Sequence, residues 1–228
     1  MGKQSWDEGR SYPDESCDSS GGLDAKKKTM GATERDEHAR SAWRAEGSQL
    51  PADQLVFVDE CGSNIALTPL YARAPRGQRA KGSAPRNRGK NTTLIASLSL
   101  QGMGEALILE GSVNATAFEI YVEQLLAPSL QEGQIVVMDN LGAHKSKRVQ
   151  QAIEVRGCRL LFLPAYSPDF SPIEETFSKL KAFLRRVGAR TREALQEALG
   201  QSLLTVTAQD AHGWFEHCGY FSSHESMR

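Results

Sequence analysis

The chain has 228 residues, with 27 basic and 28 acidic side chains, a net charge of -1, 24% charged and 39% hydrophobic residues. This is the composition of a globular protein long enough for one domain with a substantial core. No apolar run reaches the roughly 20 residues that a membrane-spanning helix needs, and the polar N-terminus shows no secretory signal, so a cytoplasmic protein with no membrane partner is expected.

The four cysteines lie far apart in the sequence, and none forms a Cys-x-x-Cys pair. A zinc knuckle or a dithiol redox motif is therefore not indicated, and reduced, mostly buried thiols are expected. The cysteines are Cys17, Cys61, Cys158 and Cys218.

The first part of the chain divides into two polar segments. Residues 1–24 are rich in Ser, Gly and acids without periodicity, which predicts a disordered N-terminal segment. Residues 25–53 are expected to form a linker with a short helix over 34–46, with Thr33 as its N-cap. The main domain is expected over 54–220, and residues 221–228 as a tail.

The next segments predict strands. The apolar run 55–58 (LVFV) is typical of a buried strand, and it ends in two acids, Asp59 and Glu60. Residues 71–90 are rich in Gly and Pro, which predicts turns or an edge hairpin. A strand over 92–100, a turn over 102–104 and a strand over 106–109 follow, and then a helix that Asn114 caps and that runs through Leu126.

The second half alternates strands and helices. A strand over 134–138 ends in Asp139 and Asn140, a helix over 146–155 ends before Gly157, and a strand follows over 159–163. The loop 164–172 (PAYSPDFSP) is made rigid by three prolines, and the last of them opens a helix. Two further helices are predicted over 191–204 and 207–217. This order predicts a mixed α/β sheet in which the segment 134–163 is parallel and right-handed.

Three acids fall at positions where such sheets carry their sites. Asp59 and Asp139 follow apolar strands, and Glu174 lies in the first turn of the helix after the next strand. If the three converge, their oxygens suit two Mg²⁺ or Mn²⁺ ions far better than zinc, and two such ions are able to promote phosphodiester displacement. Taken singly, each acid is also typical of a turn, a cap or a helix-dipole partner.

Two stretches without acids, 71–90 and 176–192, concentrate positive charge despite the negative total. Each suits a phosphate backbone, and each is equally typical of a solvated surface.

Four segments together resemble the DDE transposases of the mariner superfamily, and among them the bacterial insertion sequence 630 group. The segments are VFVDECGSN, RAPRG, VVMDNLGAHK and LPAYSPDFSPIEETFSKLKAFLR. The 34 residues between Asp139 and Glu174 are a spacing typical of that superfamily, and YSPDFSPIE is the most specific stretch. The resemblance covers about residues 26–220.

The resemblance implies a ribonuclease-H-like fold, a mixed five-stranded sheet flanked by helices. Asp59, Asp139 and Glu174 would be the catalytic, metal-binding acids of a Mg²⁺-dependent enzyme that cleaves transposon ends. The enzyme would then join them to target DNA, typically at a TA dinucleotide. It would be a bacterial, nucleoid-associated protein, and a homodimer because two ends are joined.

The resemblance also implies supporting and DNA-contacting residues. Glu60, Asn140 and His144 would support the site: Asn140 by orienting a ligand or water, and His144 either by contacting phosphate or by making local hydrogen bonds. Glu175 is expected to point about 100° away from Glu174, at the surface or in a salt bridge. The expected DNA contacts are Arg73, Arg76, Arg79 and Lys145, with Lys179 and Lys181 as weaker candidates.

The sequence departs from the family's pattern at its start. Family members carry a helix-turn-helix region that reads transposon ends, whereas about 50 mostly polar residues precede the first strand here. The chain is therefore expected to lack that reader, either as the second frame of a split gene or as a decayed copy. Two alternatives stay open: a non-catalytic DNA-binding or assembly subunit that pairs with a full-length transposase, and a ribonuclease-H-like nuclease.

Overall fold

The computed structural model describes residues 33–221. The predicted disordered segment, the start of the predicted linker, Cys17 and nearly all of the predicted tail lie outside the described residues. No helix within 33–221 combines the length and the apolar character needed to cross a membrane. Cys61, Cys158 and Cys218 are free thiols, and the first two are buried.

The first helix, α1 (Glu37–Gly47), begins later than predicted. Asp36, not Thr33, is its N-cap, because the Asp36 carboxylate accepts hydrogen bonds from the amides of His38 and Ala39 at 2.9 and 3.0 Å. A short 3₁₀ turn (Ala52–Gln54) then leads into the sheet.

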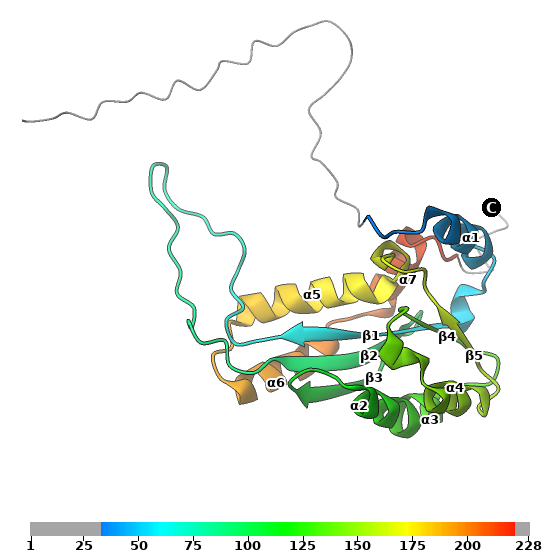
Figure 1. Cartoon of the computed structure of the whole chain (residues 1–228). Coiled ribbons are helices and arrows are strands. Elements are labelled where there is room, and N and C mark those ends of the chain that lie inside the picture. The colour runs from blue at the N-terminus through cyan, green and yellow to red at the C-terminus, as the bar shows by residue number, and fades with distance from the viewer. Residues whose placement is uncertain (1–32, 222–228) are drawn as a thin grey trace, which may run out of the picture. The chain divides into compact units, whose positions relative to one another are not determined.

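Five strands form one mixed sheet, as predicted, and their order in the sheet is β3-β2-β1-β4-β5 (Figure 1). The β1–β2 and β2–β3 pairs are antiparallel, and the β1–β4 and β4–β5 pairs are parallel. The strands are β1 (Leu55–Ser63), β2 (Thr92–Ser99), β3 (Gly102–Glu110), β4 (Ile135–Met138) and β5 (Arg159–Phe162).

Strand β1 is longer than its apolar run predicts, and Asp59 lies inside it rather than at its end. On one side β2 pairs along β1 from Phe57 to Ser63, which holds the polar half of the strand extended. On the other side the parallel pairing with β4 ends at Val58 and Met138. Asp59 is therefore the first residue of β1 beyond the reach of β4.

The segment between β1 and β2, residues 64–91, contains no strand, so of the two predicted structures only turns are present. One is closed by the amide of Gln78 on the carbonyl of Pro75 at 2.9 Å. Figure 1 shows this segment extending away from the sheet as a long loop.

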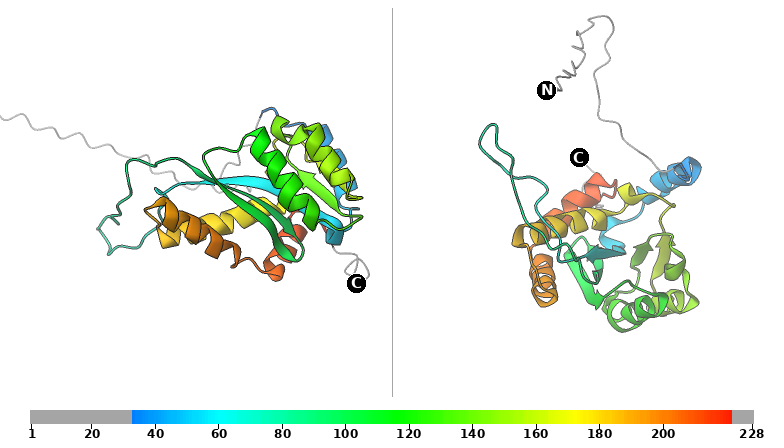
Figure 2. Two further views of the ribbon diagram at one scale, coloured as in Figure 1. Left: turned by 90° about the horizontal axis from the view of Figure 1, so that it is seen from below. Right: turned by 60° about the vertical axis from the view of Figure 1, so that its left-hand side comes forward.

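Helices cover both faces of the sheet, and Figure 2 (left) shows them on opposite sides. One apolar layer lies between the sheet and α5 (Pro172–Val187), α6 (Arg192–Leu203) and α7 (Ala208–His217). The other lies against α2 (Ala115–Tyr121), a π-helical turn (Val122–Leu126), α3 (Ala127–Ser129) and α4 (Lys147–Glu154). Period-two alternation along β1 and β4 supplies one layer with odd-numbered residues and the other with even-numbered ones.

Capping residues fix most helix ends where the sequence predicts them. Asn114 accepts from the amide of Ala117 at 2.8 Å, and Ser146 from that of Val149 at 3.2 Å. Thr191 and Thr207 cap α6 and α7 in the same way. Gly188, at φ 65°, ends α5 in the left-handed conformation that glycine adopts without strain.

Candidate active site

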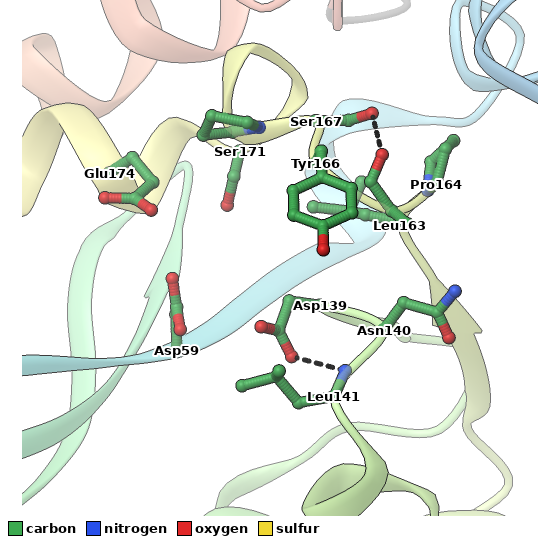
Figure 3. Close-up of a pocket in the computed structure, with 12 residues that line it drawn as sticks. Asp59, Asp139, Asn140, Leu141, Leu163, Pro164, Tyr166, Ser167, Ser171 and Glu174 are labelled. Atoms are coloured by element: carbon green, nitrogen blue, oxygen red, sulfur yellow. Dashed lines mark hydrogen bonds between the residues drawn. The ribbon is translucent and has the colours of Figure 1, made fainter. Parts of the chain in front are cut away.

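One pocket of about 400 Å³ contains all three predicted acids. Asp59 comes from β1, Asp139 from the end of β4 and Glu174 from the first turn of α5, and Figure 3 shows their side chains around the pocket. The other lining residues are Asn140, Leu141, Leu163, Pro164, Ala165, Tyr166, Ser167, Pro168 and Ser171.

Strand register places two of the acids beside each other. Phe57 and Val137 both pack into the layer under α5, so two residues further on Asp59 and Asp139 face the same side. The last parallel pair, Val58 with Met138, comes one residue before each acid, and neighbouring strands lie about 4.8 Å apart.

Glu174 reaches the pocket from the helix above the sheet. Ser171 and Pro172 open α5, and the Glu174 amide donates to the Ser171 carbonyl at 3.1 Å. The predicted turn of Glu175 away from the site is confirmed, because its carboxylate contacts the Nδ1 of His217 on α7.

The pocket is rich in negative charge. Burial raises the pKa of Asp59 to about 7, although the Glu60 amide, which donates to Asp59 Oδ1 at 2.7 Å, opposes the change. The nearby carboxylates of Glu174 and Asp139 raise it further. No lysine or arginine is among the described residues that line the pocket.

Within residues 33–221, no three acidic, histidine or cysteine side chains are drawn closely enough around one point to form a finished metal cage. The three acids share a pocket without closing on a common centre. Like charges repel each other, and the separation of the three acids is consistent with that repulsion.

His144 lies beneath the pocket and links two acids. Its Nε2 is 3.0 Å from Glu60 Oε1, and its Nδ1 is 2.5 Å from Asp139 Oδ1, in a contact not aligned as a hydrogen bond. Its ring stacks on Phe118 with centroids 4.1 Å apart. Burial lowers the pKa of His144, but the contacts with Asp139 and Glu60 outweigh burial and raise it to about 9.

This position corrects the expectation that His144 contacts phosphate, and it extends the expectation of local contacts. Its side chain is 0% exposed, so it cannot reach a DNA phosphate. Nor are its side-chain contacts purely local, because Glu60 is 84 residues away in the sequence. Glu60 follows Asp59 in β1, so their side chains point to opposite faces of the sheet. The alternation of side chains along the strand does not reveal that a residue of the loop after β4 contacts Glu60 on that face.

The remaining predicted residues near the site are exposed. Asn140 lines the pocket, and the next amide, of Leu141, donates to Asp139 Oδ1 at 3.1 Å. Lys145 is exposed, with its Nζ 5.8 Å from the centre of the Phe162 ring.

Among the residues predicted to contact DNA, the arginines are exposed, whereas the two lysines of α5 interact with other side chains of the protein. Arg73, Arg76 and Arg79 are exposed on the loop 64–91, and none of them lines the pocket. Lys179 is engaged by Asp210 of α7 at 2.6 Å. Lys181 is half-buried near Cys61, where it opposes the rise that burial causes in the thiol pKa.

An arginine that the sequence analysis did not single out as a site residue anchors the exposed loop. Arg190 Nη1 donates to the carbonyls of Ile65 and Leu67 at 2.8 and 2.9 Å. The start of the loop is thereby tied to the segment after α5.

Two apolar side chains of the pocket were also missed. Tyr166 and Leu141 are 56% and 55% exposed, and both line the pocket. Neither belongs to a periodic run, so the only signal in the sequence is their place in loops that directly follow strands.

Comparison with known proteins places the fold and the family. Residues 54–196 match the family described as DDE superfamily endonuclease. No curated protein matches the chain.

Solved structures of Mos1 transposase share the fold. A Mos1 paired-end complex with the left transposon end matches at a TM-score of 0.65 and 19% identity, over 87% of this chain and 64% of that one. A Mos1 mariner paired-end complex with Mg gives 0.64 and 18%, over 89% and 68%. The catalytic domain of Mos1 mariner transposase gives 0.53 and 17%, over 82% and 93%.

The chain thus spans less than two thirds of the Mos1 transposase in the first of these complexes. The match with the isolated catalytic domain and the five-stranded mixed sheet confirm the predicted ribonuclease-H-like fold. Because the family match covers more than half of its sequence, the chain belongs to the DDE superfamily endonucleases.

Proposed function

We propose that this chain is the catalytic part of a cut-and-paste DNA transposase, which cleaves a phosphodiester and transfers the freed strand to a second DNA. The observation that carries the proposal is the meeting of Asp59, Asp139 and Glu174 in one pocket, although they come from three distant segments.

The donor set fits hard divalent cations. The pocket offers three carboxylates and no lysine or arginine among its described lining, and the raised pKa of Asp59 reflects burial beside other carboxylates. Mos1 mariner complexes exist with Mg and with Mn, and we propose the same choice of ions here, as a pair. When bound, such cations lower the pKa of water and polarise phosphodiester oxygens.

The chain's own side chains would have distinct tasks. Asp59 holds its place on a strand that is hydrogen-bonded to β2, while His144 and Glu60 steady Asp139 from below. Asn140, at the rim, is placed to orient a ligand or a water. The exposed arginines of the loop 64–91 would bind the DNA backbone.

The proposed partners are a transposon end and a target DNA, with TA as the target sequence and a second copy or a full-length transposase completing the assembly. The Mos1 neighbours, which include a paired-end complex and a strand transfer complex, support this proposal at the level of a shared fold.

The test is nicking of duplex DNA by the full chain with Mg²⁺, with Mn²⁺ and with a chelator. Asp139→Asn and Glu174→Gln should reduce nicking to background, whereas Asp139→Asn should bind DNA as well as or better than the wild type. Glu175→Gln is the matched control, because this neighbouring acid faces His217 instead of the pocket.

Nicking that survives Asp139→Asn would refute the assigned site. No turnover with either metal, together with co-purification with a full-length transposase, would instead identify an assembly subunit. A preference for RNA–DNA hybrids over DNA duplexes would identify a ribonuclease.

A further inference from the structure

Two uncharged side chains face the acid pocket from separate loops. Tyr166 follows β5 and Leu141 follows β4, and both line the pocket while more than half exposed. Figure 3 shows the Tyr166 ring at the pocket, with its hydroxyl end turned toward the loop that carries Asp139 and Asn140. A pocket that combines large apolar and aromatic side chains with a few charged groups is typical of a site for a ligand that has an uncharged part.

The backbone of Tyr166 is held in an unusual conformation. At φ 56° it is the only residue other than glycine with a positive φ within 33–221. A bulky residue adopts this conformation only where its surroundings enforce it, and such residues cluster at functional sites. Prolines at 164 and 168 flank it, and Arg35 Nε donates to its carbonyl at 3.1 Å.

Helix α1 completes this restraint. Arg40 is 2% exposed, and its Nη1 and Nη2 donate to the two oxygens of Asp169 at 3.0 and 2.7 Å. Its guanidinium also lies 4.5 Å from the centre of the Phe170 ring. Arg35 adds a second contact to Asp169 at 3.1 Å. The loop is therefore held with Tyr166 at the pocket in the free protein, so a ligand need not order it.

The acids on one side of the pocket, and Tyr166 and Leu141 on the other, differ in chemistry, and this difference indicates where each part of a nucleotide would bind. Phosphate oxygens would lie at the acids through the proposed cations, whereas Tyr166 and Leu141 offer neither charge nor a cation site. The flat apolar group nearest to a DNA phosphate is its base, and aromatic side chains stack on bases of any sequence. A pocket of about 400 Å³ is in the range of small-ligand sites and suits one nucleotide better than a duplex.

We infer that Tyr166, with Leu141 of the neighbouring loop, stacks on the base of the nucleotide next to the phosphate at the acids, and that this nucleotide must be unpaired. The inference rests on the proposed function, since it takes the acids as the site of the scissile phosphate. It narrows the substrate to DNA that is opened, or easily opened, at the cutting position.

The test measures stacking without requiring cleavage. The full chain, with Ca²⁺ as the cation, is titrated against a duplex that carries a short single-stranded tail with 2-aminopurine at the junction, and against the fully paired duplex. Stacking on Tyr166 should quench the fluorescent base. Tyr166→Ala should abolish the quenching and weaken binding of the tailed DNA about 10-fold, with affinity for the paired duplex unchanged.

Matched variants separate stacking from general damage. Tyr166→Phe keeps the ring and should keep the quenching, and Leu141→Ala should reduce it. Leu204→Ala, an exposed apolar residue after α6 that does not line the pocket, should change nothing. Equal loss for both DNAs in Tyr166→Ala, or unchanged quenching, would overturn the inference.

Failure of this inference and of the proposed function would look different. Loss of nicking in Asp139→Asn tests the role of the acids, whereas loss of quenching in Tyr166→Ala tests the stacking. Quenching that depends on Tyr166 without any nicking would refute the proposed activity alone, and nicking that is indifferent to Tyr166 and to base pairing would refute only the stacking.

Discussion

Asp59 combines burial with nearby like charge. Its pKa is raised to about 7, so in the folded chain without a cation it releases its proton only near neutral pH. Its folded pKa exceeds the unfolded value of 3.8, so the folded state binds more protons between the two values. The stability of the chain should therefore fall as pH rises from about 4 to about 7.

Asp59→Asn should remove this pH-dependent penalty. At pH 8 with chelator we expect the variant to unfold with a free energy about 1–3 kcal/mol larger than the wild type, and the difference should shrink toward pH 4. Urea unfolding across this pH range measures the effect. Mg²⁺ should stabilise the wild type and not the variant. A variant less stable than the wild type at every pH would contradict this account of Asp59.

We propose that His144 acts through Asp139, which its ring contacts, rather than on the substrate. Changing residues that hold a metal ligand typically costs about 10- to 100-fold in metal affinity or activity. His144→Gln should therefore raise the Mg²⁺ concentration for half-maximal nicking by about that factor. Glu60→Gln should have a similar effect, and the double variant little more. His212→Gln, an exposed histidine of α7, is the control. An unchanged Mg²⁺ dependence would remove His144 from the site.

Residue positions were predictable where they follow from strand alternation. Asp59 and Asp139 share a face because each lies two residues beyond a core residue, and the sequence displays both patterns. The link from His144 to Glu60 was not predictable, because it joins distant segments through the packing of the loop after β4 against Phe118.

At the scale of elements, capping residues made the helix starts predictable, whereas pairing with neighbouring strands determined the lengths of the strands. Asn114, Ser146, Thr191 and Thr207 all begin helices where the sequence indicates. Strand β1 extends beyond its apolar run, because β2 pairs with residues that carry no hydrophobic signal. Hydrogen bonding between distant segments cannot be predicted from the sequence of one segment alone.

The loop 64–91 is the element with the clearest expected role in DNA binding. Each arginine that contacts a phosphate contributes about 0.9 to the slope of log affinity against log salt. Replacing Arg73, Arg76 and Arg79 with alanine should lower that slope by up to about 3, with the fold intact because the loop packs little. Fluorescence anisotropy at several salt concentrations measures it.

Arg156→Ala is the control for the loop, because this exposed residue follows α4 and lies outside the pocket. It should leave the slope unchanged. A triple variant with the wild-type slope would show that these arginines do not contact phosphate.

At the scale of the whole described domain, one sheet separates two apolar layers. Ile153 of α4 belongs to one layer and Leu180 of α5 to the other, and both are essentially fully buried. The alternation of strands and helices predicted this arrangement, whereas the linkage of α1 to the loop 164–171 through Arg40 and Asp169 depends on a contact 129 residues apart.

Substitutions in the two layers should add without coupling, because the sheet lies between them. Ile153→Val should cost about 0.5–1.5 kcal/mol and Leu180→Ala about 2–5 kcal/mol. The double variant should lose their sum within about 0.5 kcal/mol, in a single urea transition. Separate transitions for the two layers, or a strongly non-additive loss, would show that the layers are not parts of one cooperative unit.

The interior position of Asp59 in β1 gives the three acids unequal freedom. Asp59 is fixed in a hydrogen-bonded ladder opposite Ala96, while Asp139 is carried by a loop and Glu174 by the first turn of a helix. If a cation draws the three carboxylates together, Asp139 and Glu174 must therefore move toward Asp59, which keeps its place in the strand. Amide hydrogen exchange should accordingly slow near Leu141 and Glu174 when Mg²⁺ is added, and stay constant along β1.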